Sequence, residues 1–192
     1  FDHYEVRADS NSWTNVGTDT SYTFNLADGQ HILYVKAVDK AGNYSTDQVT
    51  IYVDTTAPTV EITNPTNGSY IGDTNVTVSW TGSDNVALDH YEVKLDTNAW
   101  EDVGLNTSKT FTGLTAEQWH TVYVKAVDKV GHETIDEVQF YVTTESPTVT
   151  ITYPLQNDYV NSQSVNITWT GNPGGSPLDH YEIQIDGGSW IN

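Results

Sequence analysis

A twelve-residue phrase occurs twice in the chain, as HILYVKAVDKAG at 31–42 and as HTVYVKAVDKVG at 120–131. In the second copy the apolar residues Val122, Val124 and Ala126 alternate with polar ones. A period of two is typical of a β-strand with one buried and one solvated face. Both copies end in a turn sequence. We therefore predict a chain that repeats a β-rich unit, which restricts the fold more than any single residue does.

Further phrases recur at wide spacing. Asp-His-Tyr-Glu begins at Asp2, Asp89 and Asp179, so the steps are 87 and 90 residues. The segment around Trp80 returns around Trp169. A period of about 90 residues exceeds a solenoid repeat and suits a small autonomous domain.

This period divides the chain into three predicted units. Residues 56–144 form a complete unit, residues 1–55 the C-terminal part of a first one, and residues 145–192 the N-terminal part of a third. The division predicts a window from a longer tandem array. The alternative is a chain whose two end pieces complete one another between molecules.

The complete unit is predicted to be a Greek-key β-sandwich. It holds seven short runs rich in Val, Ile, Thr, Tyr and Trp, bounded by Gly, Asn, Asp, Pro or Ser. So many short alternating strands in fewer than 90 residues favour two packed antiparallel sheets. We expect Val78, Trp80, Val93 and Phe140 to point inward, and residues 64–69 to form a turn.

The pattern resembles fibronectin type III domains and the related bacterial and archaeal immunoglobulin-like repeats. The resemblance implies an all-β chain of tandem immunoglobulin-like, fibronectin type III-like Greek-key sandwiches. One departure is that His31 and His120 stand where the family has its corner tyrosine. We expect these imidazoles to donate to nearby backbone and to make the corner sensitive to pH below about 6.5. The matching residues are the second-strand Trp, the Tyr that opens the third strand, the corner Leu and the small residue of the sixth strand: Trp80, Trp169, Tyr4, Tyr91, Tyr181, Leu26, Leu114, Ala37 and Ala126.

Composition excludes several classes of function. The net charge is −19, from 26 acidic and 7 basic residues, and nucleic-acid binding needs basic clusters. No apolar run reaches 18 residues, so no membrane span is expected in this window. The absence of cysteine removes disulfides and thiolate chemistry, which fits a bacterial or archaeal surface protein.

The resemblance implies stalks, adhesins, surface-layer proteins or spacers within secreted enzymes, and it names no ligand. We predict a non-catalytic structural repeat region of an extracellular or cell-surface protein of a bacterium or archaeon, as part of a stalk, filament, sheath or surface layer. The expected partners are neighbouring repeats or copies of the same protein, and surface glycans. Two alternatives stay open: an adhesin or carbohydrate-binding module, and an accessory spacer region of a secreted enzyme.

Catalysis is not expected. An Asp–His pair opens the third strand of every unit, as in Asp89-His90. Adjacent residues on a strand point to opposite faces, so we expect no hydrogen-bonded dyad. The sequence has no Gly-rich phosphate loop, HExxH motif or nucleophile elbow.

Calcium is the one cofactor that the sequence suggests. In this fold the entry of a unit, its second-to-third-strand loop and its sixth-to-seventh-strand loop meet at one end. They would bring Asp54, Asp84 and Asp128 together, and Ca²⁺ prefers such carboxylate ligands. The alternative is that these acids serve solubility alone.

Two further sets of surface residues are candidates. N-glycosylation sequons occur at Asn43, Asn67, Asn75, Asn106 and Asn166. An outer face is expected to contact an acidic neighbour or a glycan, the alternative being ordinary cross-strand pairing, and it comprises Tyr34, Tyr52, Tyr123, Tyr141, Lys36 and Lys125.

Overall fold

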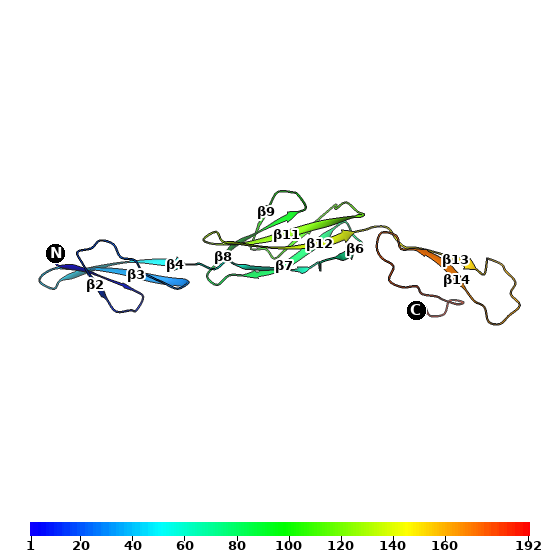
Figure 1. Ribbon diagram of the computed structural model, residues 1–192, viewed down its shortest axis with the longest axis horizontal. Coiled ribbons are helices and arrows are strands. Elements are labelled where there is room, and N and C mark those ends of the chain that lie inside the picture. The colour runs from blue at the N-terminus through cyan, green and yellow to red at the C-terminus, as the bar shows by residue number, and fades with distance from the viewer. The chain divides into compact units, whose positions relative to one another are not determined.

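The computed structural model describes residues 1–192, and its ordered elements are fourteen strands without a helix (Figure 1). No helix is present that has the length and apolar character of a membrane span. The first sheet is antiparallel, in the order β2-β1-β3-β4. Its strands are β1 (His3–Ala8), β2 (Thr14–Gly17), β3 (Gly29–Val38) and β4 (Tyr44–Val53).

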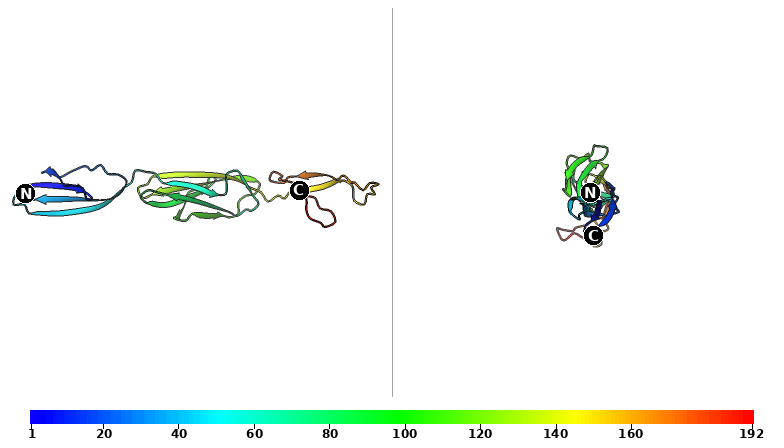
Figure 2. Two further views of the ribbon diagram at one scale, coloured as in Figure 1. Left: turned by 90° about the horizontal axis from the view of Figure 1, so that it is seen from below. Right: turned by 90° about the vertical axis from the view of Figure 1, so that its left-hand side faces the viewer.

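The middle residues form two sheets that pack as a sandwich, which confirms the predicted fold class; Figure 1 and Figure 2 show the layers from two sides. One sheet has the order β10-β7-β5, from β5 (Thr59–Asn64), β7 (Val76–Ser83) and β10 (Ser108–Phe111). The other has the order β6-β12-β11-β8-β9, from β6 (Ser69–Ile71), β8 (Leu88–Leu95), β9 (Glu101–Gly104), β11 (Gln118–Asp128) and β12 (Glu133–Val142).

A fourth sheet pairs β13 (Thr148–Tyr153) with β14 (Thr168–Asn172) in antiparallel register. The first and fourth sheets have apolar side chains in contact with solvent, such as Val35, 46% exposed, and Ile151, 55% exposed. By contrast, the residues of the sandwich bury the corresponding positions. The apolar side chains of a strand are therefore fully buried only where a second sheet packs against its own sheet.

By its internal contacts the chain divides into two compact units, and the division crosses β5, β7, β11 and β12. It does not follow the sequence repeat, so the boundaries at 56 and 145 stay a prediction. One unit comprises Phe1–Ile62, Trp80–Thr107 and Tyr123–Asp136, and the other comprises Thr63–Ser79, Ser108–Val122 and Glu137–Asn192.

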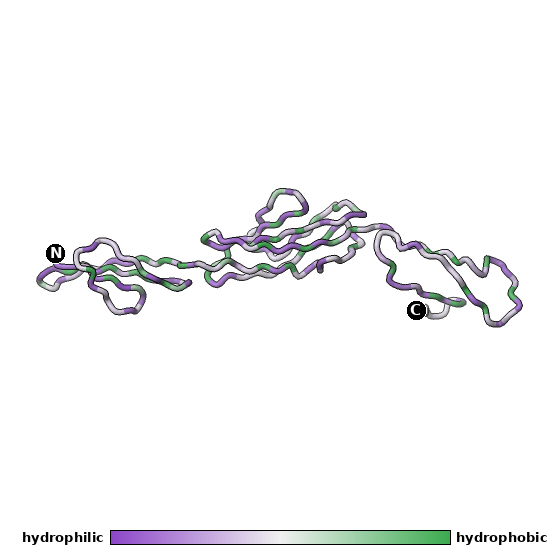
Figure 3. Tube along the Cα trace, viewed as in Figure 1, coloured by the Kyte–Doolittle hydropathy of each residue, from purple (hydrophilic) through white to green (hydrophobic).

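The core of the sandwich follows the alternation that the sequence predicts. Val78, Trp80, Val93 and Phe140 are all at most 2% exposed. Figure 3 shows apolar and polar residues alternating along these strands. Each buried large side chain stabilises the fold by about 1.5–3 kcal/mol relative to its exposed state.

Strand β6 was not expected, because residues 64–69 were predicted as a turn. The turn is present, since the Ser69 amide donates to the Thr66 carbonyl at 3.2 Å. After it the chain runs parallel to β12, with Tyr70 opposite Tyr141. A three-residue strand is too short to show a period of two, so the sequence pattern does not reveal it.

The corner histidines donate to the backbone, as predicted. His120 is 3% exposed, and its Nε2 lies 2.9 Å from the Thr115 carbonyl oxygen. His31 Nε2 makes the same bond to the Ala27 carbonyl oxygen at 2.9 Å. In both repeats the imidazole thus donates the hydrogen bond expected of the phenol, and it fixes the chain just before β3 and just before β11.

Candidate functional site

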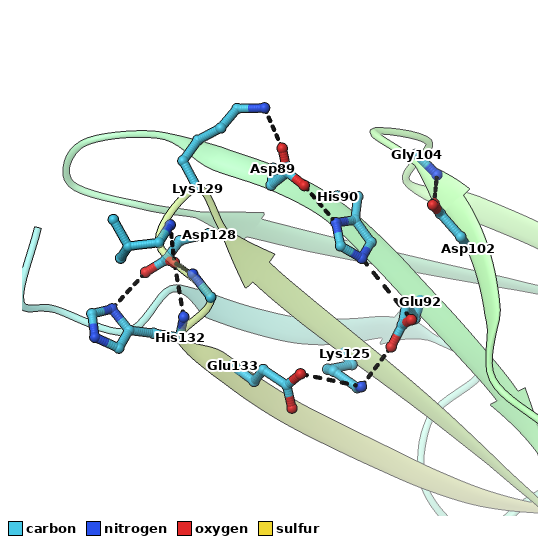
Figure 4. A network of polar contacts seen from close by, with 12 residues as sticks. Asp89, His90, Glu92, Asp102, Gly104, Lys125, Asp128, Lys129, His132 and Glu133 are labelled. Carbon is cyan, nitrogen blue, oxygen red and sulfur yellow. Dashed lines mark hydrogen bonds and ion pairs between the residues drawn. The ribbon is translucent and has the colours of Figure 1, made fainter. Parts of the chain in front are cut away.

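The outer face of β8, β11 and β12 carries a chain of ion pairs (Figure 4). Lys125 Nζ lies 2.5 Å from Glu92 Oε2 and 3.5 Å from Glu133 Oε1. The hydrogen bond to Glu92 is the main cause of a raised Lys125 pKa. In the first sheet Lys36 pairs with Glu5 at 2.5 Å, which lowers the Glu5 pKa. These two lysines are therefore already engaged within their own sheets.

Beside these pairs, Trp100 and Tyr123 meet edge to face at a centroid distance of 6.4 Å. Lys94 Nζ lies 4.1 Å from the Tyr123 ring and 4.9 Å from the Trp100 ring. Lys125 Nζ lies 4.7 Å from the Trp100 ring. Each such cation–π contact is worth about 0.5–1 kcal/mol at an exposed site.

The first sheet repeats this arrangement. Trp13 and Tyr34 meet edge to face at 6.3 Å. The Arg7 guanidinium lies 4.6 Å from the Trp13 ring and 4.4 Å from the Tyr34 ring, and Lys36 lies 4.2 Å from Trp13. The sequence does not predict these stacks, although Trp13 and Trp100 recur at one position of the repeat.

The predicted interaction face therefore has two kinds of residue. The side chains of Lys36 and Lys125 are only 18% and 12% exposed, because their charges are paired internally. Tyr52, by contrast, is 63% exposed. Contact of this face with a partner stays a prediction, and Tyr52 is its most accessible member.

The expectation that the Asp–His pairs form no hydrogen bond is wrong. His90 Nδ1 lies 2.9 Å from Asp89 Oδ2, and His3 Nδ1 lies 2.9 Å from Asp2 Oδ2. Alternation fixes the direction of each Cβ, but Nδ1 lies close to the backbone, where a neighbouring carboxylate can reach it. His180 and Asp179 make the same contact at 2.7 Å.

These pairs lack the geometry of a catalytic dyad. The other ring nitrogen of His90 faces Glu92 Oε1 at 4.0 Å, a second carboxylate rather than a hydroxyl to be activated. Asp89 also contacts Lys129 (Figure 4), and this hydrogen bond is the main reason for its lowered pKa. The Asp–His pair is thus one link in a run of surface charges.

The predicted calcium ligands are only partly brought together. Asp54 and Asp128 each offer a ligand atom within 4.8 Å of the other and of His132, whereas Asp84 lies outside this group. Asp54 Oδ2 and Asp84 Oδ1 are buried without a hydrogen-bond partner. A buried carboxylate oxygen without a donor is costly, and a cation would satisfy it. Calcium binding at Asp54, Asp84 and Asp128 stays a prediction, and the His132 imidazole beside Asp54 and Asp128 is not an oxygen ligand of the kind that Ca²⁺ prefers.

Asp128 is held by hydrogen bonds at both of its carboxylate oxygens. Its Oδ1 accepts hydrogen bonds from the backbone amides of Val130, Gly131 and His132 at 2.7–2.9 Å. Its Oδ2 lies 2.7 Å from His132 Nδ1 (Figure 4). Burial alone would raise the Asp128 pKa, but the hydrogen bonds from His132, Val130 and Gly131 outweigh it and lower the pKa.

Asp28 is a further structural acid, and the sequence does not predict its role. Asp28 accepts hydrogen bonds from the Thr55 amide and hydroxyl at 3.0 and 2.8 Å and from the Thr56 hydroxyl at 2.7 Å. These bonds, that of Thr56 first, lower the Asp28 pKa. The acid therefore holds the segment by which the chain leaves β4.

Glu117 has the same role after β12. It stands three residues before His120, as Asp28 stands three before His31. Its carboxylate accepts hydrogen bonds from the Thr144 amide at 2.8 Å and the Thr143 hydroxyl at 2.9 Å. The shared spacing from the corner histidine is the sequence signal that identifies both acids.

All five sequon asparagines are exposed. Three of them already use the amide nitrogen that would carry a glycan: Asn43 donates to Asp39 at 2.9 Å, Asn75 to Asp73 at 3.2 Å, and Asn106 to the Val103 carbonyl at 2.8 Å. Glycosylation at Asn43, Asn67, Asn75, Asn106 and Asn166 stays a prediction.

The structure thus holds one β-sandwich and two single sheets, and Asp28 and Glu117 each stand three residues before a corner histidine. Residues 58–124 match the family model of the bacterial Ig domain. This match and the all-β sandwich agree with the immunoglobulin-like, fibronectin type III-like fold that the sequence predicts.

Two bacterial enzymes are similar to this chain. Chitinase A1 of Niallia circulans is 32% identical over 175 residues, which is 87% of this chain and 24% of the enzyme. Exoglucanase B of Cellulomonas fimi is 33% identical over 149 residues, which is 71% of this chain and 13% of the enzyme. The chain spans a quarter or less of the length of either relative.

Two solved structures also resemble it. The fibronectin(III)-like modules of Clostridium thermocellum CbhA are 20% identical, with a TM-score of 0.40, and the match covers 73% of this chain and 77% of that one. A tetra-tandem repeat in the extending region of a large adhesion protein is 23% identical, with a TM-score of 0.40, and the match covers 88% of this chain and 48% of that one.

Proposed function

We propose that this chain is a non-catalytic repeat region of a bacterial extracellular protein, in which the sandwiches act as spacers. The observation that carries the proposal is the repeated acid at the exit of each repeat. Asp28 and Glu117 hold the segments that follow β4 and β12 by several hydrogen bonds each. A segment fixed in this way limits bending between consecutive sandwiches.

The setting of the spacer is part of the proposal. One candidate is a stalk, filament, sheath or surface layer on the cell. The other is an accessory region of a secreted enzyme that acts on polysaccharide, and the similarity to a chitinase and an exoglucanase favours it. The partners are neighbouring repeats in both cases.

A distance measurement across the exit segment tests the spacer. The chain contains no cysteine, so Thr46→Cys and Thr81→Cys provide two unique sites for spin labels on exposed strand positions. We expect a single narrow distance distribution by pulsed electron resonance. Asp28→Asn should broaden it, while Asp19→Asn, at an exposed position in another loop, should not. A broad distribution before any substitution at Asp28 contradicts the spacer proposal.

A further inference from the structure

Three aromatic rings from three adjacent strands meet on the outer face of the sandwich. Tyr70 comes from the edge strand β6, Tyr141 from β12 and Trp119 from β11. The centroid distances are 5.8 Å for Tyr70–Trp119, 5.5 Å for Tyr70–Tyr141 and 5.5 Å for Trp119–Tyr141. We call these residues the aromatic triad.

The triad faces solvent. Tyr141 lies between the buried Phe140 and Val142, and Trp119 precedes the buried His120, so alternation directs both rings away from the core. Tyr70 is 47% exposed and Trp119 is 48% exposed. Clustered exposed aromatic rings mark interaction surfaces, because their burial against a partner is favourable.

Two other tryptophan clusters, at Trp13 and Trp100, are covered by the chain's own cations, and the Trp80–Tyr91 pair is buried in the core. Arg7 and Lys36 lie over Trp13, and Lys94 and Lys125 lie over Trp100. The cation–π contacts of the structure involve these two clusters and not Trp119. The triad is therefore the tryptophan cluster in the sandwich that remains open to a ligand.

The triad is not a requirement of the fold. The first repeat has the same corner histidine at His31, and the residue before it is Gln30, where the middle repeat has Trp119. Gln30 lies opposite Tyr52 on β4. One copy of this strand pair thus holds a glutamine and the other a tryptophan.

The charge around the triad indicates what it would accept. Burial, then the nearby carboxylates of Glu117 and Glu145, raise the Tyr141 pKa. Carboxylates beside the rings repel anionic glycans and phosphates. Glu117 is also occupied by the hydrogen bonds of Thr143 and Thr144, which leaves it poorly placed to pair with a cationic peptide. These carboxylates thus favour a neutral ligand over an anionic one.

We propose that the aromatic triad is a docking surface for a neutral polysaccharide. The C–H faces of its sugar rings would pack on Trp119 and Tyr70, since the face of an aromatic ring carries negative charge. The sugar hydroxyls would bond to the two phenols and to the indole N–H. The proposal goes beyond the spacer function, and either can fail while the other stands.

The test measures binding of the whole chain to insoluble chitin and to microcrystalline cellulose by depletion from solution. Trp119→Gln installs the residue of the first repeat, and Tyr70→Ser is a second variant at the edge strand. The control is Tyr159→Ser, which removes a fully exposed ring outside the triad. Far-UV circular dichroism and melting temperature establish that each variant is folded.

We expect the parent chain to bind at least one of the two polysaccharides. Each triad variant should lose about tenfold or more in affinity, while the control keeps the affinity of the parent. If Trp119→Gln unfolds, Tyr70→Ser decides. No binding by the parent, equal binding by a folded triad variant, or binding of polylysine in place of both polysaccharides overturns the proposal. The spin-label distances report on the spacer separately.

Discussion

The phenol of Tyr91 occupies the space that a side chain at position 82 would need. A Cβ on Gly82 would lie 2.6 Å from the Tyr91 hydroxyl oxygen and 2.6 Å from the Thr59 carbonyl oxygen. Tyr91 in turn meets Trp80 edge to face at 5.9 Å. Gly171 and Tyr181 stand in the same relation in the next repeat. The Trp80-Thr81-Gly82 segment of β7 and Tyr91 of β8 therefore pack together as one unit.

Gly82→Ala is expected to destabilise the sandwich by about 1–3 kcal/mol, because the new methyl group overpacks against Tyr91 and the Thr59 carbonyl. Urea unfolding followed by tryptophan fluorescence measures the change. The matched control is Gly72→Ala, where the only neighbour of a Cβ is the Thr143 carbonyl oxygen at 4.0 Å. Equal stabilities for the two variants would show that the Gly82–Tyr91 contact does not restrict the chain.

The stack on Trp100 should contribute measurably to stability. A double-mutant cycle with Lys94→Met and Tyr123→Leu is expected to give a coupling energy of about 0.5–1 kcal/mol, since the ammonium lies 4.1 Å from the ring centroid. Melting of the four proteins in low salt provides the values. Additive effects within experimental error would contradict a direct cation–π contribution.

The stability that His31 contributes is predicted to change with pH in the direction opposite to the one expected from the sequence. The hydrogen bond from His31 to Asp9, followed by that to the Ala27 carbonyl, raises the His31 pKa. A raised pKa in the folded state gives stability that is complete below the unfolded value of about 6.5 and is lost as pH rises through the folded value. The corner thus weakens on alkalisation rather than near pH 6.

Proton NMR titration of the His31 ring checks this directly, and we expect a midpoint above 6.5. Asp9→Asn should lower the midpoint, while Asp19→Asn leaves it unchanged. The Asp9 pKa is itself lowered, first by the His31 hydrogen bond, so its own contribution is lost as pH falls through the folded value. A His31 midpoint at or below 6.5 in the parent chain would refute the pairing.

Calcium is predicted to raise the melting temperature of the chain through the carboxylates of Asp54 and Asp128, the two of the three predicted ligands that lie together. Ligands that bind only the folded state stabilise it by mass action. Asp54→Asn should abolish the shift, because Asp54 Oδ2 is buried without a hydrogen-bond partner. This substitution leaves intact the hydrogen bonds by which Asp128 holds its own loop. The control is Asp158→Asn, in a distant turn of the sequence. No calorimetric heat and an unmoved melting temperature would dispose of the calcium site.

The sequence predicts the core of this protein well, because burial imposes a period that a single strand displays. Val78, Trp80, Val93 and Phe140 all lie inside as expected. The corner histidines also follow from their position in the repeat. These inferences depend on backbone direction alone, which alternation fixes.

What the sequence did not predict depends on the reach of side-chain tips or on very short segments. Asp89 and His90 form a hydrogen bond at the start of β8, although their Cβ atoms point to opposite faces of the strand. Lys94 folds over Trp100 from a neighbouring strand, and no sequence period marks that contact. Strand β6 has only three residues, so its pattern is indistinguishable from the turn before it.

We expect a repeat of about 90 residues to be a self-contained sandwich. The most direct test is to express residues 56–144 alone and to record an amide ¹H–¹⁵N correlation spectrum with a urea unfolding curve. We expect dispersed β-type resonances and a single cooperative transition. A collapsed spectrum without a transition, in buffer where the whole chain is folded, would contradict it.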